Sequence, residues 1–296
     1  MDVTGNTHRA EICIDKLYNP ESQTGRLGLV ELRAFEMPPH HQMAVVQMLL
    51  IRSLICRFLL SPYREKLIHW SDALHDKFML PHFLLEDLLD VLRDLQDHGI
   101  ELQAEWFKPF LDFRFPLLGT VNLEKVRLEL RVAHEPWYVL SVMEDSAQRS
   151  TLSRPVDSSM ERLQIRVSNL NAERHKLLVN GVEMPLVSVG PAGEYIAAVR
   201  FRAWQPPNCL HPNIEVHHPL RFEVLDSWSK RSLGACQYHV VHPEGKLYEE
   251  PPLTRHDASA RVYRRFVEGN HTPWPVEYRA VTDNGAGSVT LDLRLY

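Results

Sequence analysis

Apolar and polar residues alternate in two short stretches near the start of the chain. The alternation runs through Glu11–Asp15 and again through Leu29–Ala34. A period of two residues is typical of a strand that buries one face. The connecting residues include Asn19, Pro20 and Gly25, which favour turns. The pattern therefore predicts a β hairpin of two strands.

Helical periodicity replaces this alternation between residues 40 and 115. Met43–Leu60 is apolar on nearly all sides, which is typical of a helix buried in a core. A second helix is predicted to begin at Pro81, a residue favoured in the first turn, and to end near Gly99. Its leucines recur every three or four residues, with charged residues on the other side. We expect the first helix to be the central, buried one.

Short β-rich segments separated by turn residues follow from about residue 120. They are Lys125–Val132, Trp137–Met143, Arg162–Val167, Lys176–Val179, Ala197–Trp204, Arg221–Leu225, Ala235–Val241 and Ser288–Tyr296. Asn180-Gly181, between two apolar triplets, is the strongest hairpin signal in the chain. Short strands at this spacing favour an antiparallel sandwich or a small barrel.

These patterns predict an α+β fold. A β hairpin and a helical segment come first, and an antiparallel β-sandwich-like domain follows. The polar stretch Glu144–Asp157 is the expected break, which divides the chain into residues 1–150 and 151–296.

Composition excludes several classes of protein. The 296 residues are 44% hydrophobic and 24% charged, as in an ordinary soluble protein, and a net charge of −5 does not indicate nucleic-acid binding. Arg52 and Arg57 interrupt the one long apolar run, and each costs about 2.5–3.5 kcal/mol at a bilayer centre, so we expect no membrane span. The four cysteines form no CxxC pair, which predicts reduced thiols and a cytoplasmic location.

Charged side chains share one face of the predicted hairpin. If the apolar residues of both strands lie on the same face of the hairpin, Asp15 pairs with Glu31. Glu11 and Arg33 would then lie beside this pair. Opposed like charges destabilise a sheet, so the face favours a bridging cation such as Mg²⁺, which binds carboxylate and phosphate oxygens. Arg33 could hold a phosphate or carboxylate through its planar guanidinium, with Lys16 as a weaker candidate. The alternative is an ordinary solvated strand face, which spacing alone favours.

Two further groups of residues have both a functional and a structural interpretation. His69, Asp72, His75 and Asp76 recur at helical spacing, but a metal site needs more convergent ligands, so capping and packing are favoured. Trp204 and Trp228 suit a sugar-binding platform or, more commonly, packing.

Long stretches of the sequence resemble a bacterial family of amidoligases, whose members are often large and contain a transglutaminase-like domain. The stretches are Ala10–Tyr18, Thr24–Pro39, Leu74–Phe83, Phe110–Pro116, Glu135–Trp137, Val156–Ser159, Glu161–Gln164, Arg202–Pro207 and His271–Pro273. They span nearly the whole chain, and they resemble the last third of the family proteins.

The resemblance implies ATP-dependent joining of a carboxylate to an amine, on a peptide or amino-acid substrate. It also implies a sheet similar to that of glutamine synthetase and glutamate–cysteine ligase, where strand acids hold Mg²⁺ and an arginine contacts phosphate. The corresponding metal ligands here are Glu11, Asp15, Glu31 and Glu36. Glu31 and Arg33 become the expected catalytic residues, and Arg33 and Lys16 the expected nucleotide contacts.

A ligase sheet needs more strands and acids than residues 1–40 provide. We therefore expect an upstream ligase and transglutaminase-like region, in the same or a neighbouring chain, and no activity from this chain alone. The alternative is a non-catalytic sandwich module that binds a peptide, a glycan or a partner chain.

Overall fold

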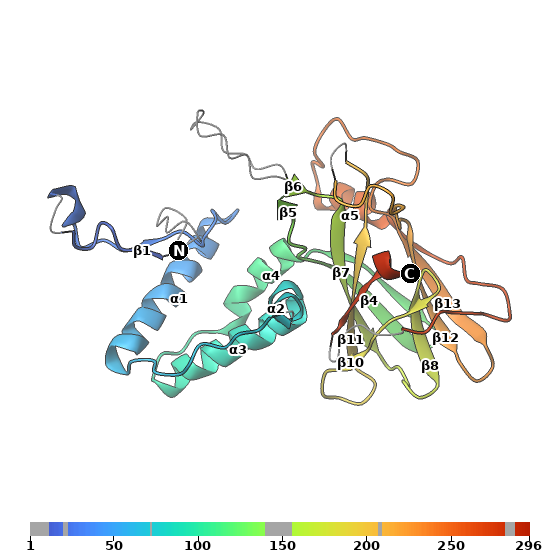
Figure 1. The fold of residues 1–296 in the computed structure, drawn as a ribbon, viewed down its shortest axis with the longest axis horizontal. Coiled ribbons are helices and arrows are strands. Elements are labelled where there is room, and N and C mark those ends of the chain that lie inside the picture. The colour runs from blue at the N-terminus through green and yellow to red at the C-terminus, as the bar shows by residue number, and fades with distance from the viewer. Residues whose placement is uncertain (1–11, 20–22, 72, 140–155, 207–208, 282–287) are drawn as a thin grey trace.

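The computed structural model describes residues 12–19, 23–71, 73–139, 156–206, 209–281 and 288–296. A β sandwich forms one end of the molecule, and a helical arm extends from it (Figure 1). A small hairpin lies at the far end of the arm. The predicted α+β class is confirmed, with the hairpin and helices first and an antiparallel sandwich after them.

Two sheets make up the sandwich. The first sheet contains β3 (Leu117–Leu123), β4 (Val126–Ala133), β7 (Met160–Ser168), β10 (Val187–Ser188), β11 (Tyr195–Arg202) and β15 (Thr290–Asp292). The second contains β8 (His175–Val179), β9 (Val182–Glu183), β12 (Leu220–Asp226), β13 (Arg231–Tyr238) and β14 (Phe266–Glu268). Their orders are β10-β11-β7-β4-β3, with β15 beside β11, and β14-β13-β12-β8-β9. Among the described strands, only β11 and β15 pair in parallel.

The main core lies between the two sheets because alternate residues of each strand face inward. In β7, Leu163, Ile165 and Val167 are fully buried in this core. Their neighbours Arg162 and Gln164 take the opposite face of the sheet, as the alternation of a strand requires. The sandwich is therefore apolar inside and charged on the outer face of its first sheet.

Local turn chemistry determines the hairpin between β8 and β9. Asn180 and Gly181 have φ angles of 48° and 80°, the positive values that a two-residue hairpin turn needs. This prediction is confirmed, as are most of the other strands, with ends shifted by a few residues. Of Ser288–Tyr296, only Thr290–Asp292 is a strand, and the 3-10 helix Leu293–Leu295 follows it. Of Trp137–Met143, the structure shows β5 (Tyr138–Val139), which pairs with β6 (Val156–Asp157). The last residues of that segment lie outside the described part of the chain.

The first sheet crosses the predicted domain boundary. Strands β3 and β4 precede residue 150, yet β4 pairs with β7 along Arg127–Ala133. The sheet topology therefore places Leu117 onward in the sandwich, while the division into two domains at residue 150 stays a prediction.

The described residues form five α helices and three 3-10 helices. The α helices are α1 (His41–Leu60), α2 (Ala73–Met79), α3 (Pro81–Asp97), α4 (Lys108–Arg114) and α5 (Arg255–Tyr263). The 3-10 helices are η2 (Gln23–Gly25), η3 (Ala104–Phe107) and η4 (Leu293–Leu295). The predicted helix at Pro81 is confirmed. It ends where the Ile100 N–H donates to the Leu95 carbonyl and Gly99 takes a φ of 80°, an arrangement that glycine favours.

The prediction that Met43–Leu60 is a central, buried helix is wrong. Val45 of α1 is 65% exposed and Leu59 is 79% exposed, whereas Arg57 is buried. The reason is an ion pair, in which Arg57 Nε and Nη2 donate to the two carboxylate oxygens of Asp94 in α3 at 2.8 and 2.9 Å. This contact fixes the rotation of α1, so that Val46, Leu50 and Leu54 face α3 while Val45 and Leu59 face away from it. By length and composition only, α1 is the one helix in the described residues that is apolar enough to cross a membrane.

The register predicted for the N-terminal hairpin is also wrong. Strands β1 (Ile12–Cys13) and β2 (Glu31–Leu32) pair Cys13, not Asp15, with Glu31. The chain turns too early for the predicted pairing, because the Leu17 N–H donates to the Ile14 carbonyl at 2.9 Å and Asp15 lies in the turn. The predicted apolar face is also reversed, since Cys13 is 5% exposed and Ile12 is 60% exposed.

Candidate functional site

The hairpin brings Asp15 and Lys16 close to the pair that Arg33 and Glu31 form. Arg33 Nη2 donates to Glu31 Oε2 at 3.1 Å, and both side chains are accessible to solvent. Asp15 and Lys16, in the turn after β1, lie close enough for their charges to act on this pair. Acidic and basic side chains therefore meet at the hairpin although the predicted pairing of Asp15 with Glu31 is wrong, and their role as a site stays a prediction.

The electrostatics of the pair keep both groups charged. The hydrogen bond from Arg33 lowers the pKa of Glu31, and the charge of Lys16 acts in the same direction. The same hydrogen bond raises the pKa of Arg33, with the charge of Asp15 among the smaller causes. At neutral pH the cluster offers a guanidinium for anions and a carboxylate for cations.

One of the other predicted metal ligands, Glu36, does not join this cluster. Glu36 pairs with Arg114 of α4, and Glu11 lies outside the described residues. In the described part of the chain, no group of three or more His, Cys, Asp or Glu side chains is placed to hold a metal ion. Asp15 and Glu31 have the carboxylate oxygens that Mg²⁺ prefers and would be the residues to hold it if it binds here. Mg²⁺ and ATP at this site stay predictions.

A buried ion network joins the helical arm to the sandwich, and the sequence did not reveal it. The side chain of Glu135 is 3% exposed and accepts from Arg162 Nε at 3.0 Å and from Arg200 Nε at 2.6 Å. Arg200 also pairs with Asp292 at 3.2 Å, and Arg162 lies 3.4 Å from Asp76. These side chains come from α2, the loop after β4, and the outer faces of β7, β11 and β15. The network attaches the arm to the sheet.

Asp76 acts as a packing residue. It accepts hydrogen bonds from the Val289 N–H at 2.9 Å, from Ser288 Oγ at 3.3 Å and from Thr290 Oγ1 at 2.5 Å. These contacts agree with the packing interpretation of the histidine and aspartate cluster. Asp72 lies outside the described residues.

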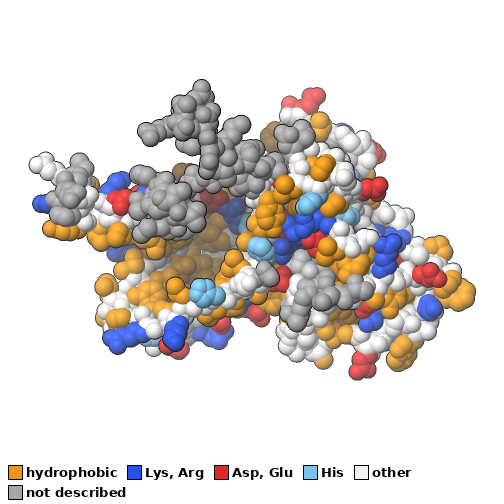
Figure 2. Space-filling view, viewed as in Figure 1, with side chains coloured by type: hydrophobic (Ala, Val, Ile, Leu, Met, Phe, Trp, Pro, Cys, Tyr) orange, Lys and Arg blue, Asp and Glu red, His pale blue; other side chains and the backbone are white. Residues whose placement is uncertain are grey.

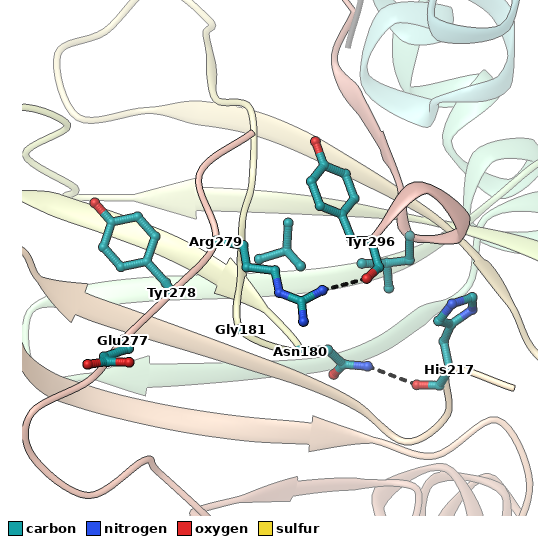
Figure 3. A pocket seen from close by; sticks show the side chains of 9 residues that line it. Asn180, Gly181, His217, Glu277, Tyr278, Arg279 and Tyr296 are labelled. Carbon is teal, nitrogen blue, oxygen red and sulfur yellow. Dashed lines mark hydrogen bonds between the residues drawn. The ribbon is translucent and has the colours of Figure 1, made fainter. Parts of the chain in front are cut away.

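A cavity of about 500 Å³ opens at the edge of the sandwich (Figure 3). Its wall combines the Asn180 turn, residues 277–279 and the end of the chain. Arg279 Nη1 donates to the Tyr296 backbone oxygen at 2.5 Å, and Asn180 Nδ2 donates to the His217 carbonyl at 2.9 Å. Burial lowers the pKa of His217, whose Nδ1 accepts from the Arg202 N–H at 3.0 Å. The cavity therefore has a polar wall with a neutral histidine.

The tryptophans of the sandwich do not fill its core. Trp228 is 73% exposed, and the Arg174 guanidinium lies 5.2 Å from its ring centre. Arg174 is itself paired with Asp226, which lowers the pKa of that carboxyl. Trp204 is 41% exposed. No pairing of the two indole rings is found in the described residues.

Comparison with protein families gives a match over residues 1–294, to the family described as "Putative amidoligase enzyme". The chain belongs to this amidoligase family. The resemblance inferred from the sequence motifs is thus confirmed. No curated protein and no solved structure matched the chain. The family match does not concern a transglutaminase-like domain, so that part of the expectation stays a prediction.

Sequence reasoning located the hairpin of this amidoligase family member but missed the network around Glu135. A signal was present, because Arg162, Gln164 and Arg166 alternate with apolar residues in β7. Such alternation predicts a polar outer face. It does not predict that the helical arm covers part of that face, which depends on contacts between residues far apart in the chain.

Proposed function

We propose that this chain forms part of an ATP-dependent carboxylate–amine ligase, in which the hairpin supplies one edge of the nucleotide site. The observation that supports this proposal is the Arg33–Glu31 pair at 3.1 Å, with Asp15 and Lys16 beside it, in a member of a family described as amidoligases. The proposed substrate is a peptide or an amino acid. The proposed location is the cytoplasm.

The chemistry of such a ligase assigns a role to each of these side chains. The substrate carboxylate takes the terminal phosphoryl group of ATP and becomes an acyl phosphate, and the amine then displaces phosphate to form the amide. Arg33 would donate to the phosphate oxygens through its planar guanidinium. Glu31 and Asp15 would hold the site's Mg²⁺ ion, which neutralises phosphate charge when bound. The Glu31 pair keeps the Arg33 side chain in place before nucleotide binds.

The site needs further strands. Strands β1 and β2 contain two residues each, and Ile12 in β1 and Ile14 just after it are 60% and 59% exposed. We propose that an upstream ligase region, with a transglutaminase-like domain, completes the sheet from the same or a neighbouring chain. The present residues alone would then be inactive.

Calorimetric titration of Mg-ATP tests the proposal, with this chain alone and with the upstream region included. We expect Mg-ATP to bind only when the upstream region is included. In that form, Arg33→Ala and Glu31→Gln should each lower the Mg-ATP affinity at least tenfold. Arg64→Ala is a matched control, because Arg64 is an exposed arginine outside the hairpin, and His75→Ala should also retain binding. Two results would contradict the proposed nucleotide site. One is equal Mg-ATP affinity of Arg33→Ala and the unmodified protein. The other is no Mg-ATP binding either by this chain alone or by the form that includes the upstream region.

The cavity at the sandwich edge favours a second candidate, a non-catalytic module that binds a peptide. Its wall presents Glu277, Tyr278 and Arg279 on one segment. A titration with short peptides, monitored by NMR, should then show weaker peptide binding for Tyr278→Ala, while Mg-ATP binding is retained. Peptide binding that depends on Arg33 instead would assign the peptide to the ligase site.

A further inference from the structure

One face of α1 is apolar and uncovered by the described residues, and we call it the α1 stripe. It consists of Val45, Met48, Leu49, Arg52, Ile55, Cys56, Leu59 and Leu60. At 3.6 residues per turn these side chains lie within an arc of about 140°. Met48 is 56% exposed, Ile55 52% and Leu60 75%. The spacing of three and four residues is that of a helix seam.

The opposite face of α1 is already occupied, so the exposure of the stripe is a consequence of the fold. Val46, Leu50 and Leu54 pack against the core that α3 and η3 form. The Arg57–Asp94 ion pair fixes the rotation of the helix about its axis. Figure 2 shows hydrophobic side chains gathered over the helical arm.

An apolar groove of about 740 Å³ adjoins the stripe. The groove lies between the first half of α1 and the residues Trp106 and Pro109. Val45 and Leu49 belong to both the groove and the stripe. A ridge of side chains on a second helix fits such a groove, because helices pack with ridges in grooves.

The charge within the stripe indicates what the second helix must present. Arg52 lies in the stripe with apolar residues before and after it, and its side chain is exposed. In the described part of the chain, no acidic side chain pairs with Arg52. A helix that covers the stripe would desolvate this guanidinium, and a carboxylate opposite it would compensate.

We propose that the α1 stripe docks an amphipathic helix of a partner polypeptide, with apolar residues at heptad spacing and a carboxylate facing Arg52. A second copy of this chain fits less well, because a two-fold pairing of stripes about their middle places two Arg52 side chains together. A lipid bilayer fits less well too, because Arg52 lies in the middle of the stripe and its guanidinium would be costly to place in hydrocarbon. The proposal uses no hairpin residue and is independent of the proposed ligase function.

The test uses the full chain and a labelled synthetic helical peptide of three heptads, with leucine at the seam positions and one central glutamate. Fluorescence anisotropy compares it with a peptide that has lysine at the central position. We expect the glutamate peptide to bind at least tenfold more tightly, and Arg52→Glu to reverse this preference. Met48→Glu should weaken binding at least tenfold. Leu253→Glu is the control, since Leu253 is 85% exposed on the sandwich side of the chain.

Three results would overturn the proposal. Equal binding of the glutamate and lysine peptides to the unmodified chain would show that Arg52 has no role. The Arg52→Glu variant still tests the proposal if Met48→Glu fails to fold. A dimer in sedimentation experiments that Met48→Glu dissociates would identify a second copy as the occupant. Cosedimentation with phosphatidylcholine vesicles that Met48→Glu abolishes would identify lipid.

Discussion

Replacing Glu135 by alanine removes the carboxylate that two buried arginines share. The Glu135 side chain is 3% exposed, and those of Arg162 and Arg200 are 4% and 11% exposed. Both guanidinium groups would stay buried after the exchange, because they lie between the arm and the sheet. The variant therefore measures how much this network stabilises the attachment of the arm.

The expected loss in the free energy of unfolding depends on the partners that each arginine keeps in the variant. Removing one partner of a buried ion pair costs about 3–5 kcal/mol. Arg200 keeps Asp292 at 3.2 Å, and Arg162 keeps Asp76 at 3.4 Å and Thr290 at 3.0 Å. These contacts place the expected loss at the lower end, about 3 kcal/mol. At about 2–4 °C per kcal/mol for a unit of this size, the melting temperature should fall by about 6–12 °C.

Urea unfolding followed by tryptophan fluorescence measures this loss. Glu129→Ala is the matched control, because Glu129 pairs with Arg131 at 2.7 Å but both side chains are about one quarter exposed. We expect the control to lose less than about 1 kcal/mol. Equal destabilisation by the two variants would refute the reasoning, since it would mean that burial of the Glu135 network adds nothing.

Two further predictions concern the arm and the sandwich edge. Arg57→Ala should destabilise the arm by about 1–3 kcal/mol, because two charge-assisted hydrogen bonds to Asp94 are lost. Thermal melting followed by circular dichroism measures this loss, and the control Arg64→Ala should not show it. Burial lowers the pKa of His217 from its ordinary value of 6.5, so the folded chain binds this proton less readily than the unfolded chain. Stability should therefore fall as the pH decreases below 6.5, and His217→Gln should reduce that slope in urea midpoints; an unchanged slope would contradict the assignment.

Local patterns in the sequence predicted the elements that depend on neighbouring residues. Asn180 and Gly181 adopt positive φ angles because glycine has no Cβ and asparagine tolerates this region, and the turn follows from those two residues. Pro81 begins α3 for a similarly local reason. The contact between Glu31 and Arg33 is an intermediate case, since the two residues are only two positions apart in the chain and can meet in almost any register of the hairpin.

Contacts between distant residues decided the rest. The pairing of Asp15 with Glu31 failed because register depends on where the chain turns, and the turn came one residue after Ile14. The sequence of α1 by itself determined that it is a helix and that it is apolar. Which side of it meets water depends on the Arg57–Asp94 pair, whose members are 37 residues apart. A periodic pattern records which faces are apolar, but only tertiary contacts determine which of two apolar faces is covered.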